Sequence, residues 1–218
     1  IIKFNLDGFN LHDVETGMGT AVVPKVKQGS SLLIEGSPDL QKLTSSIIVP
    51  DNKKMEIRVV SSEFTDYYNI DVAPSKGNLL RSVVPSDVPY TWSEAYNTDQ
   101  FFPGNLADLM EPYILKEKRG QTVVVYPFQY NPISKVLRVY SEIVVEIFHN
   151  GIGQKNVKER KLNRSNNLKS SNEFQQIYSS HFINNNEDSR FEYLVDHGNM
   201  LIISYGDFID EMEDFVLW

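Results

Sequence analysis

The chain has 218 residues, of which 41% are hydrophobic and 23% charged, and this composition suits one or two packed domains and excludes a disordered chain. Residues 1–190 hold all 21 basic residues and 22 of the 29 acids, so this part is nearly neutral and has no basic field for nucleic acid. No apolar run reaches the length that spans a membrane, and the lack of cysteine excludes disulfides and a thiol nucleophile in these residues.

Short β-type segments dominate residues 1–150. IIKFNL, GTAVVPKV and KMEIRVVSSEF are rich in β-branched and aromatic residues and are separated by Gly, Pro, Asn and Asp. In MEIRVV, the alternation places Met55, Ile57 and Val59 on one face. Many short strands with regular turns predict one antiparallel β-sandwich over residues 1–150.

Residues 74–112 form a long connection that contains five of the ten prolines. Long connections inside compact domains are often functional. We expect a partly ordered surface loop with one short helix at NLADLM, residues 105–110.

The clearest strand signal lies in residues 121–148. The sequence reads as two long strands around the turn YNPISK, residues 130–135. We expect the core of the sandwich to include the apolar residues Val123, Val125, Leu137, Val139, Ile143 and Val145.

Residues 151–190 read as a basic linker followed by a short helix. The basic residues lack interleaved aromatics, which favours a solvated linker over a nucleic-acid patch. Ser171 or Asn172 is a candidate N-cap for a helix that docks on the sandwich. The apolar residues at helical spacing are Phe174, Ile177, Tyr178 and Phe182.

The pattern changes after Arg190. NMLIISYG reads as a continuous apolar strand ending at Gly206, and DFIDEMEDFVLW as an amphipathic helix. A buried strand, a glycine turn and a helix are typical of the start of a parallel α/β domain, so residues 191–218 are expected to be the truncated start of a second domain. We expect this unit to be unstable alone.

No catalytic or metal site is predicted in the chain. The four histidines have no His or Cys partner at ligand spacing, and no serine lies in a nucleophile elbow. Exposed aromatics would indicate an adhesion or carbohydrate-binding module instead. The candidates are Tyr67, Tyr68, Tyr90, Trp92 and Tyr96.

A series of sequence blocks resembles the amino-terminal prodomain of the arginine-specific gingipains and the first residues of their catalytic domain. In chain order the blocks are VVSSEF, APSKG, YNTDQFFPG, PYILKEKRGQTV, YPFQYNPISKVLRVYSEIVVEI and GNMLIISYGDFIDEMEDFVLW. The resemblance covers nearly the whole chain and is weakest in residues 1–50 and 150–190. It implies an inhibitory, folding-assisting β-sandwich propeptide whose partner is the caspase-like catalytic domain of a cysteine endopeptidase.

The same resemblance implies roles for two arginines. Arg81 falls where the family has an arginine in the loop that enters the active-site cleft; without the resemblance, an ordinary surface arginine is the simpler interpretation. Arg190 falls at the processing site, before Phe191, although it could instead cap the preceding helical region. The family is secreted or surface-bound in Gram-negative Bacteroidetes. Its catalytic His and Cys and its calcium sites lie beyond Trp218, so no cofactor is expected in this chain.

Overall fold

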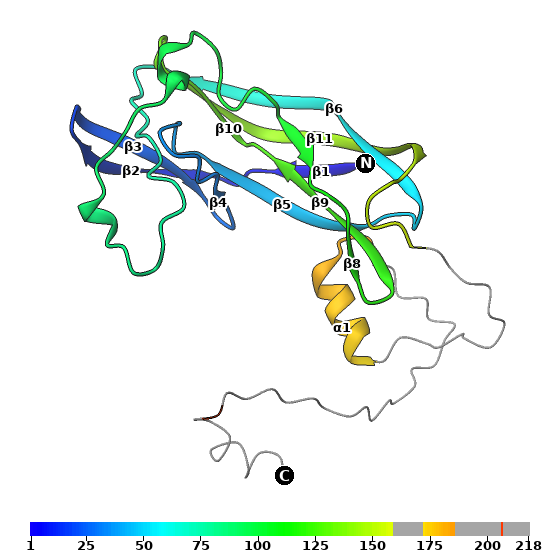
Figure 1. Ribbon diagram of the computed structural model, residues 1–218. Coiled ribbons are helices and arrows are strands. Elements are labelled where there is room, and N and C mark those ends of the chain that lie inside the picture. Colours follow the sequence, from blue (N-terminus) through cyan, green and yellow to red (C-terminus); the bar gives the residue numbers. More distant parts are fainter. Residues whose placement is uncertain (159–171, 186–205, 207–218) are drawn as a thin grey trace, which may run out of the picture.

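The computed structural model describes residues 1–158, 172–185 and 206, which form mainly antiparallel sheets (Figure 1). The predicted mainly β, antiparallel fold is confirmed. The predictions for Arg190, Phe191 and the strand and helix of residues 191–218 lie outside the described residues, apart from Gly206. The domain boundaries at residues 150 and 190 stay predictions.

The first sheet is built around the longest strand, β11. Its strands are β1 (Ile2–Asn5), β6 (Lys53–Tyr67), β10 (Phe128–Asn131) and β11 (Val136–Ile152). Strand β6 pairs along nearly all of one edge of β11, and β1 and β10 share the other edge.

The second sheet is built around β9, which pairs with β5 on one edge and with β7 and β8 on the other. Its strands are β4 (Ser30–Ser31), β5 (Gln41–Ile48), β7 (Ala107–Leu109), β8 (Tyr113–Leu115) and β9 (Lys118–Val125). The helix predicted at residues 105–110 is therefore wrong. Ala107 and Leu109 pair with Val125 and Val123 and pack against the core, and this pairing overrides local helix propensity.

The predicted long strand before the turn at residues 130–135 is in fact two strands in different sheets. Pro127 has no N–H to continue the ladder of β9, and its carbonyl accepts from Tyr140 N at 2.9 Å in the first sheet. The turn itself is confirmed: Asn131 Oδ1 accepts the backbone N–H groups of Ile133 at 3.0 Å and Ser134 at 3.2 Å.

Two larger buried clusters and one small one fill the molecule. The cluster between the two sheets contains Ile47, Val49, Val123, Val125, Tyr140, Ile143 and Val145. The second contains Leu40, Val72, Phe128, Tyr130, Leu137 and Val139. All six predicted core residues are buried, but β11 divides its four between the two clusters. A bulge at Ser141 inserts one extra residue into β11. Odd-numbered residues before the bulge therefore face the second cluster, and odd-numbered residues after it face the cluster between the sheets.

A similar irregularity affects β6. The pairing shifts between Ser61 and Val59, which leaves Val60 as an extra residue in that strand. Met55, Ile57 and Val59 precede this shift and pair in unbroken register with His149, Ile147 and Val145, so they share one face as predicted. Met55 and Ile57 pack against the core, and Val59 is 38% exposed.

A hairpin covers the second cluster. It consists of β2 (Phe9–Thr16) and β3 (Gly19–Val26), and Phe9 contacts Phe128 edge-on at 5.7 Å between ring centroids. Val22 on β3 forms a parallel bridge to Val72, so the hairpin is joined to the chain that follows β6.

The predicted docking helix is confirmed as α1 (Asn172–His181). Tyr178 and Phe182 are buried, while Ile177, predicted on the same apolar face, is 43% exposed. After the helix, Ile183 N donates to Ser46 O at 3.0 Å, and the Asn184 amide pairs with both the N–H and the carbonyl of Ile48. The chain just after α1 is thus bound to the edge of β5 opposite β9, beyond the short pairing with β4.

Candidate functional site

Residues 76–92, here called the projecting loop, leave the sandwich and return to it at a narrow neck. Gly36 N donates to Ser75 O at 2.9 Å, Ser75 N donates to Ser37 O at 2.8 Å, and Ser93 N donates to Gly36 O at 2.9 Å. One short segment therefore binds both ends of the loop. Figure 1 shows this blue-green loop at the end of the molecule where β2 and β3 lie, whereas α1 lies at the other end.

Glycine makes the close approach at the neck possible. Gly36 has φ +73°, and a Cβ there would lie 3.0 Å from Ser93 N. Gly77 has φ +77°, and a Cβ there would lie 3.1 Å from the Cβ of Glu35. The neck is completed by the Ser37 and Ser93 hydroxyls, 3.3 Å apart.

Arg81 lies at the tip of the projecting loop. A turn closed by Val83 N donating to Leu80 O at 3.0 Å places Arg81 and Ser82 at its two central positions. The Arg81 side chain is exposed and forms no hydrogen bond or ion pair with the part of the chain that the structure describes. Leu80 and Val84 beside it are 74% and 55% exposed, so the tip presents one free cation with apolar neighbours.

Two 3-10 helices give the loop region internal order: η1 (Pro85–Asp87) within the loop and η2 (Glu94–Asn97) just after the neck. Ser93 caps η2 by accepting from Ala95 N. Tyr96 on η2 donates its hydroxyl to Val72 O at 2.8 Å, and burial raises the pKa of this phenol. These contacts hold the chain after the loop against the sandwich.

An arginine on β11 anchors the segment that follows η2. Arg138 makes a two-point contact with Asp66, at 2.7 and 2.9 Å, and its guanidinium lies 4.0 Å from the ring centroid of Phe64 and 4.3 Å from that of Phe101. The hydrogen bonds from Arg138 lower the pKa of the Asp66 carboxyl. The segment that returns from the loop is thereby fixed to the first sheet.

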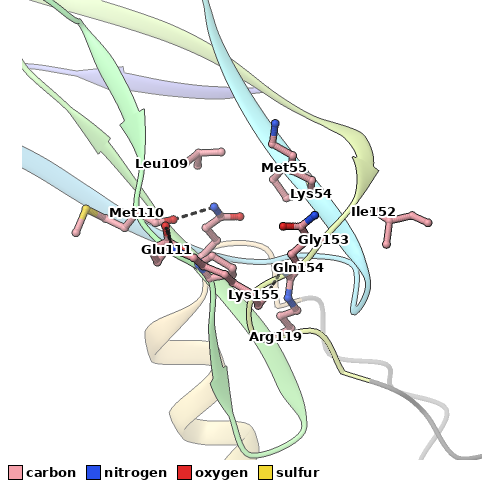
Figure 2. Close-up of a pocket in the computed structure, with 12 residues that line it drawn as sticks. Lys54, Met55, Leu109, Met110, Glu111, Arg119, Ile152, Gly153, Gln154 and Lys155 are labelled. Atoms are coloured by element: carbon pink, nitrogen blue, oxygen red, sulfur yellow. Dashed lines mark hydrogen bonds and ion pairs between the residues drawn. The ribbon is translucent and has the colours of Figure 1, made fainter.

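A buried arginine on β9 fixes the chain that leaves β11. Arg119 is only 2% exposed and donates to four backbone carbonyls: Pro50 at 2.8 Å, Lys53 at 2.9 Å, Lys155 at 3.1 Å and Asn156 at 2.8 Å. Burial lowers the pKa of Arg119. Figure 2 shows Arg119 beside Lys155 at the side of a cavity of about 460 Å³. Our sequence reasoning missed this site.

A signal for that site does exist in the sequence. Every second residue of β9 faces inward, and the last two of these are the buried Val123 and Val125. The same alternation places Arg119 and Gln121 at inward positions. Gln121 donates to Met110 O at 2.8 Å. A polar residue at an inward position of a strand needs buried partners, which for Arg119 are the four carbonyls.

The aromatics considered for a carbohydrate-binding face are divided among different places. Trp92 and Tyr96 line one pocket with residues of the β2–β3 hairpin. Tyr90 packs against a small apolar cluster, and Tyr67 contacts Phe9 edge-on at 5.4 Å between ring centroids. This arrangement gives no support for a single aromatic binding platform.

In residues 1–158, 172–185 and 206, no group of three or more His, Cys, Asp or Glu side chains is placed to hold a metal ion. Within the same residues, no helix combines the length and apolar character that a membrane span requires.

Two packed antiparallel sheets form a β-sandwich domain, and the family match places this domain in the propeptide class. The chain belongs to the Propeptide_C25 family, whose model matches residues 1–189. It is 36% identical over 220 residues to gingipain R2 of Porphyromonas gingivalis and 35% identical over 219 residues to gingipain R1. All of the chain is covered, but it spans only 29% and 21% of those proteins.

Solved structures agree with this assignment. The fold matches a chain in the complex of the pro- and mature domains of Porphyromonas gingivalis RgpB with a TM-score of 0.74 and 37% identity, covering 84% of this chain and 90% of that chain. A structure on the zymogenic latency of gingipain K has a TM-score of 0.59 at 22% identity and covers 68% of this chain and 85% of that chain, which shows likeness of fold alone. The resemblance to gingipain prodomains is confirmed.

Proposed function

We propose that this chain is the inhibitory and folding-assisting propeptide of a secreted or surface-bound gingipain-like cysteine endopeptidase that cleaves after arginine. Its partner is the catalytic domain of that peptidase, and any calcium belongs to that domain. The single observation that carries the proposal is the projecting loop, which is bound at both ends and offers an unpaired arginine at its tip.

The chemistry of Arg81 suits insertion into a specificity pocket. A pocket built for arginine presents a carboxylate and fixed acceptors to the planar guanidinium. Because Arg81 has no described partner to give up, it binds such a pocket without first breaking an ion pair. Leu80 and Val84 supply apolar surface on either side for the rim of the cleft.

The structural order of the projecting loop is also expected to strengthen inhibition. Binding a flexible segment costs conformational entropy, and a segment that is already ordered loses less of it. The neck and η1 restrict the projecting loop before it meets the peptidase. We therefore expect tighter inhibition from the folded chain than from a free peptide of residues 76–92.

Release of the peptidase is proposed to follow cleavage between Arg190 and Phe191. Asn184 and Ile183 bind the preceding chain to β5. Residue 190 lies six positions after Asn184 in the sequence.

The test is an inhibition constant measured with this chain and an active arginine-specific gingipain-type peptidase. Arg81→Ala is expected to weaken inhibition by about tenfold or more, since loss of even one charge-assisted hydrogen bond amounts to that factor. Arg81→Lys is expected to weaken it as well, because a lysine lacks the two-point fork. Arg58→Ala, which removes an exposed arginine from β6, is the matched control. Unchanged inhibition by Arg81→Ala would remove Arg81 from the mechanism.

A further inference from the structure

Lys76 makes an unusual connection across the projecting loop. Its Nζ donates to the carbonyl of Pro85 at 2.7 Å and lies 4.2 Å from the centroid of the Tyr90 ring. Tyr90 in turn packs against the small buried cluster that includes Ala73. Lys76 therefore links the first residue of the loop both to η1 and to an aromatic ring that is fixed to the sandwich.

The link divides the loop into two rings. Residues 76–85 form the outer ring, which Lys76 closes, and Arg81 lies five positions after Lys76 and four before Pro85. The turn from Leu80 to Val83 forms the apex of this ring. Without Lys76, the next closure outside the Leu80–Val83 turn among the described residues would be the neck at Ser75 and Ser93.

We propose that Lys76 is a positioning residue that holds Arg81 at the apex of a closed ring, so that the cognate peptidase binds the loop but hydrolyses the bond between Arg81 and Ser82 only slowly. This inference rests on the proposed role of Arg81. It extends that role by explaining why an exposed arginine offered to an arginine-specific peptidase acts as an inhibitor and not as a substrate.

The reasoning follows from the chemistry of cleavage. A cysteine peptidase first displaces the Ser82 amine and forms a thioester between its own cysteine and the Arg81 carbonyl carbon; water then hydrolyses the thioester to leave the Arg81 carboxylate and the free thiol. Productive cleavage therefore requires the Ser82 amine to move away before it attacks the thioester and reseals the peptide bond. The Lys76 link keeps the Ser82 side within a short ring, at an effective concentration in the millimolar range or above, and resealing therefore competes with separation.

Lys76 is also suited to holding the loop before binding. A cation over an aromatic face and a hydrogen bond from a charged donor are each modest at an exposed site, but together they restrict the backbone on both sides of Arg81. Loss of this restriction raises the entropy that the loop gives up on binding. The variant without the link is therefore expected to be both a weaker inhibitor and a better substrate.

The experiment compares Lys76→Met, Lys76→Arg, Lys27→Met and Arg81→Ala in the 218-residue chain. Each variant is mixed with an active arginine-specific gingipain-type peptidase, the inhibition constant is measured, and the fragment ending at Arg81 is quantified over time by mass spectrometry. Lys27 is an exposed lysine for which the described residues show no hydrogen bond or ion pair, and its substitution removes the same charge elsewhere.

Lys76→Met is expected to raise the inhibition constant about tenfold, equivalent to about 1.4 kcal/mol, and to speed cleavage after Arg81 by a similar factor. Lys76→Arg keeps a cation that reaches Pro85 and Tyr90, so it should restore most of both properties. Lys27→Met should match the wild type, and the melting temperature of all variants should stay within a few degrees.

The outcomes separate the inference from the proposed function. If Arg81→Ala loses inhibition while Lys76→Met inhibits and resists cleavage like the wild type, the role of Lys76 is refuted and the inhibitory role of Arg81 stands. A loss of inhibition in Lys76→Met without faster cleavage after Arg81, or without rescue by Lys76→Arg, also refutes it. If Arg81→Ala inhibits normally, both proposals fail.

Discussion

Replacing Arg119 by methionine tests how much a buried cation contributes when its partners are carbonyl groups and not a carboxylate. The substitution keeps most of the side-chain volume and removes four hydrogen bonds, to Pro50, Lys53, Lys155 and Asn156. Each bond from a charged donor contributes about 1.5–3 kcal/mol, but burial of the guanidinium costs several kcal/mol, and the cavity beside it lets water reach some freed carbonyls. We expect a net loss of about 2–4 kcal/mol in the free energy of unfolding.

The assay is urea unfolding followed by tryptophan fluorescence and circular dichroism. The midpoint should fall while the dependence on denaturant stays unchanged, because the folded state keeps its surface. The unfolding midpoint of Arg119→Lys should lie between those of the wild type and Arg119→Met, since three donors on one ammonium cannot reach all four carbonyls. Arg58→Met removes an exposed arginine paired with Glu146 and should cost less than about 1 kcal/mol. An Arg119→Met chain as stable as the wild type would refute the reasoning.

Three further predictions concern other parts of the molecule. Gly120→Ala should displace α1, because a Cβ there would lie 2.6 Å from a ring carbon of Phe182, the residue that follows this helix. The readout is faster hydrogen exchange in residues 172–185, and the control is Gly104→Ala, where a Cβ would meet nothing within 4 Å. Asp66→Asn should destabilise the chain at neutral pH: the contact with Arg138 lowers the folded-state pKa of Asp66, so its stabilisation is present above the ordinary value of 3.8 and is lost as the pH falls through the lowered one. Equal destabilisation in strong acid would contradict that mechanism. Arg190→Gln in the full-length protein should block processing; amino-terminal sequencing of the wild-type peptidase should begin at Phe191, and a distant start would exclude this site.

The parts of the fold that the sequence predicted are those controlled by local pattern. Alternation in β9 and β11 identified the buried valines, the turn after β10 followed from Asn and Pro, and α1 followed from helical spacing. The helix predicted at residues 105–110 failed because strand pairing with β9 decides its conformation. The division of the core at Ser141 could not be predicted, since a bulge depends on the register of the partner strand.

The candidate site divides in the same way. Composition indicated that the segment around Arg81 is accessible, and the exposed tip agrees with that prediction. The neck could not be anticipated, because Gly36 and Ser37 precede the loop by some forty residues and nothing local links them to Ser75 or Ser93. The role of Lys76 likewise depends on a contact nine residues away.

The neck makes the projecting loop an exchangeable unit. Both ends of the loop bond to the same two residues, Gly36 and Ser37, and Tyr90 adds a contact with the sandwich near the second end, so the residues around the tip are held only through attachments near the two ends of the loop. Changes in loop length add only a logarithmic closure cost, about 0.6 kcal/mol for each doubling. Residues at the tip can therefore vary without disturbing the sheets, and the same sandwich can carry tips shaped for peptidases of different preference. In engineering terms, the domain is a scaffold on which inhibitory sequences can be grafted.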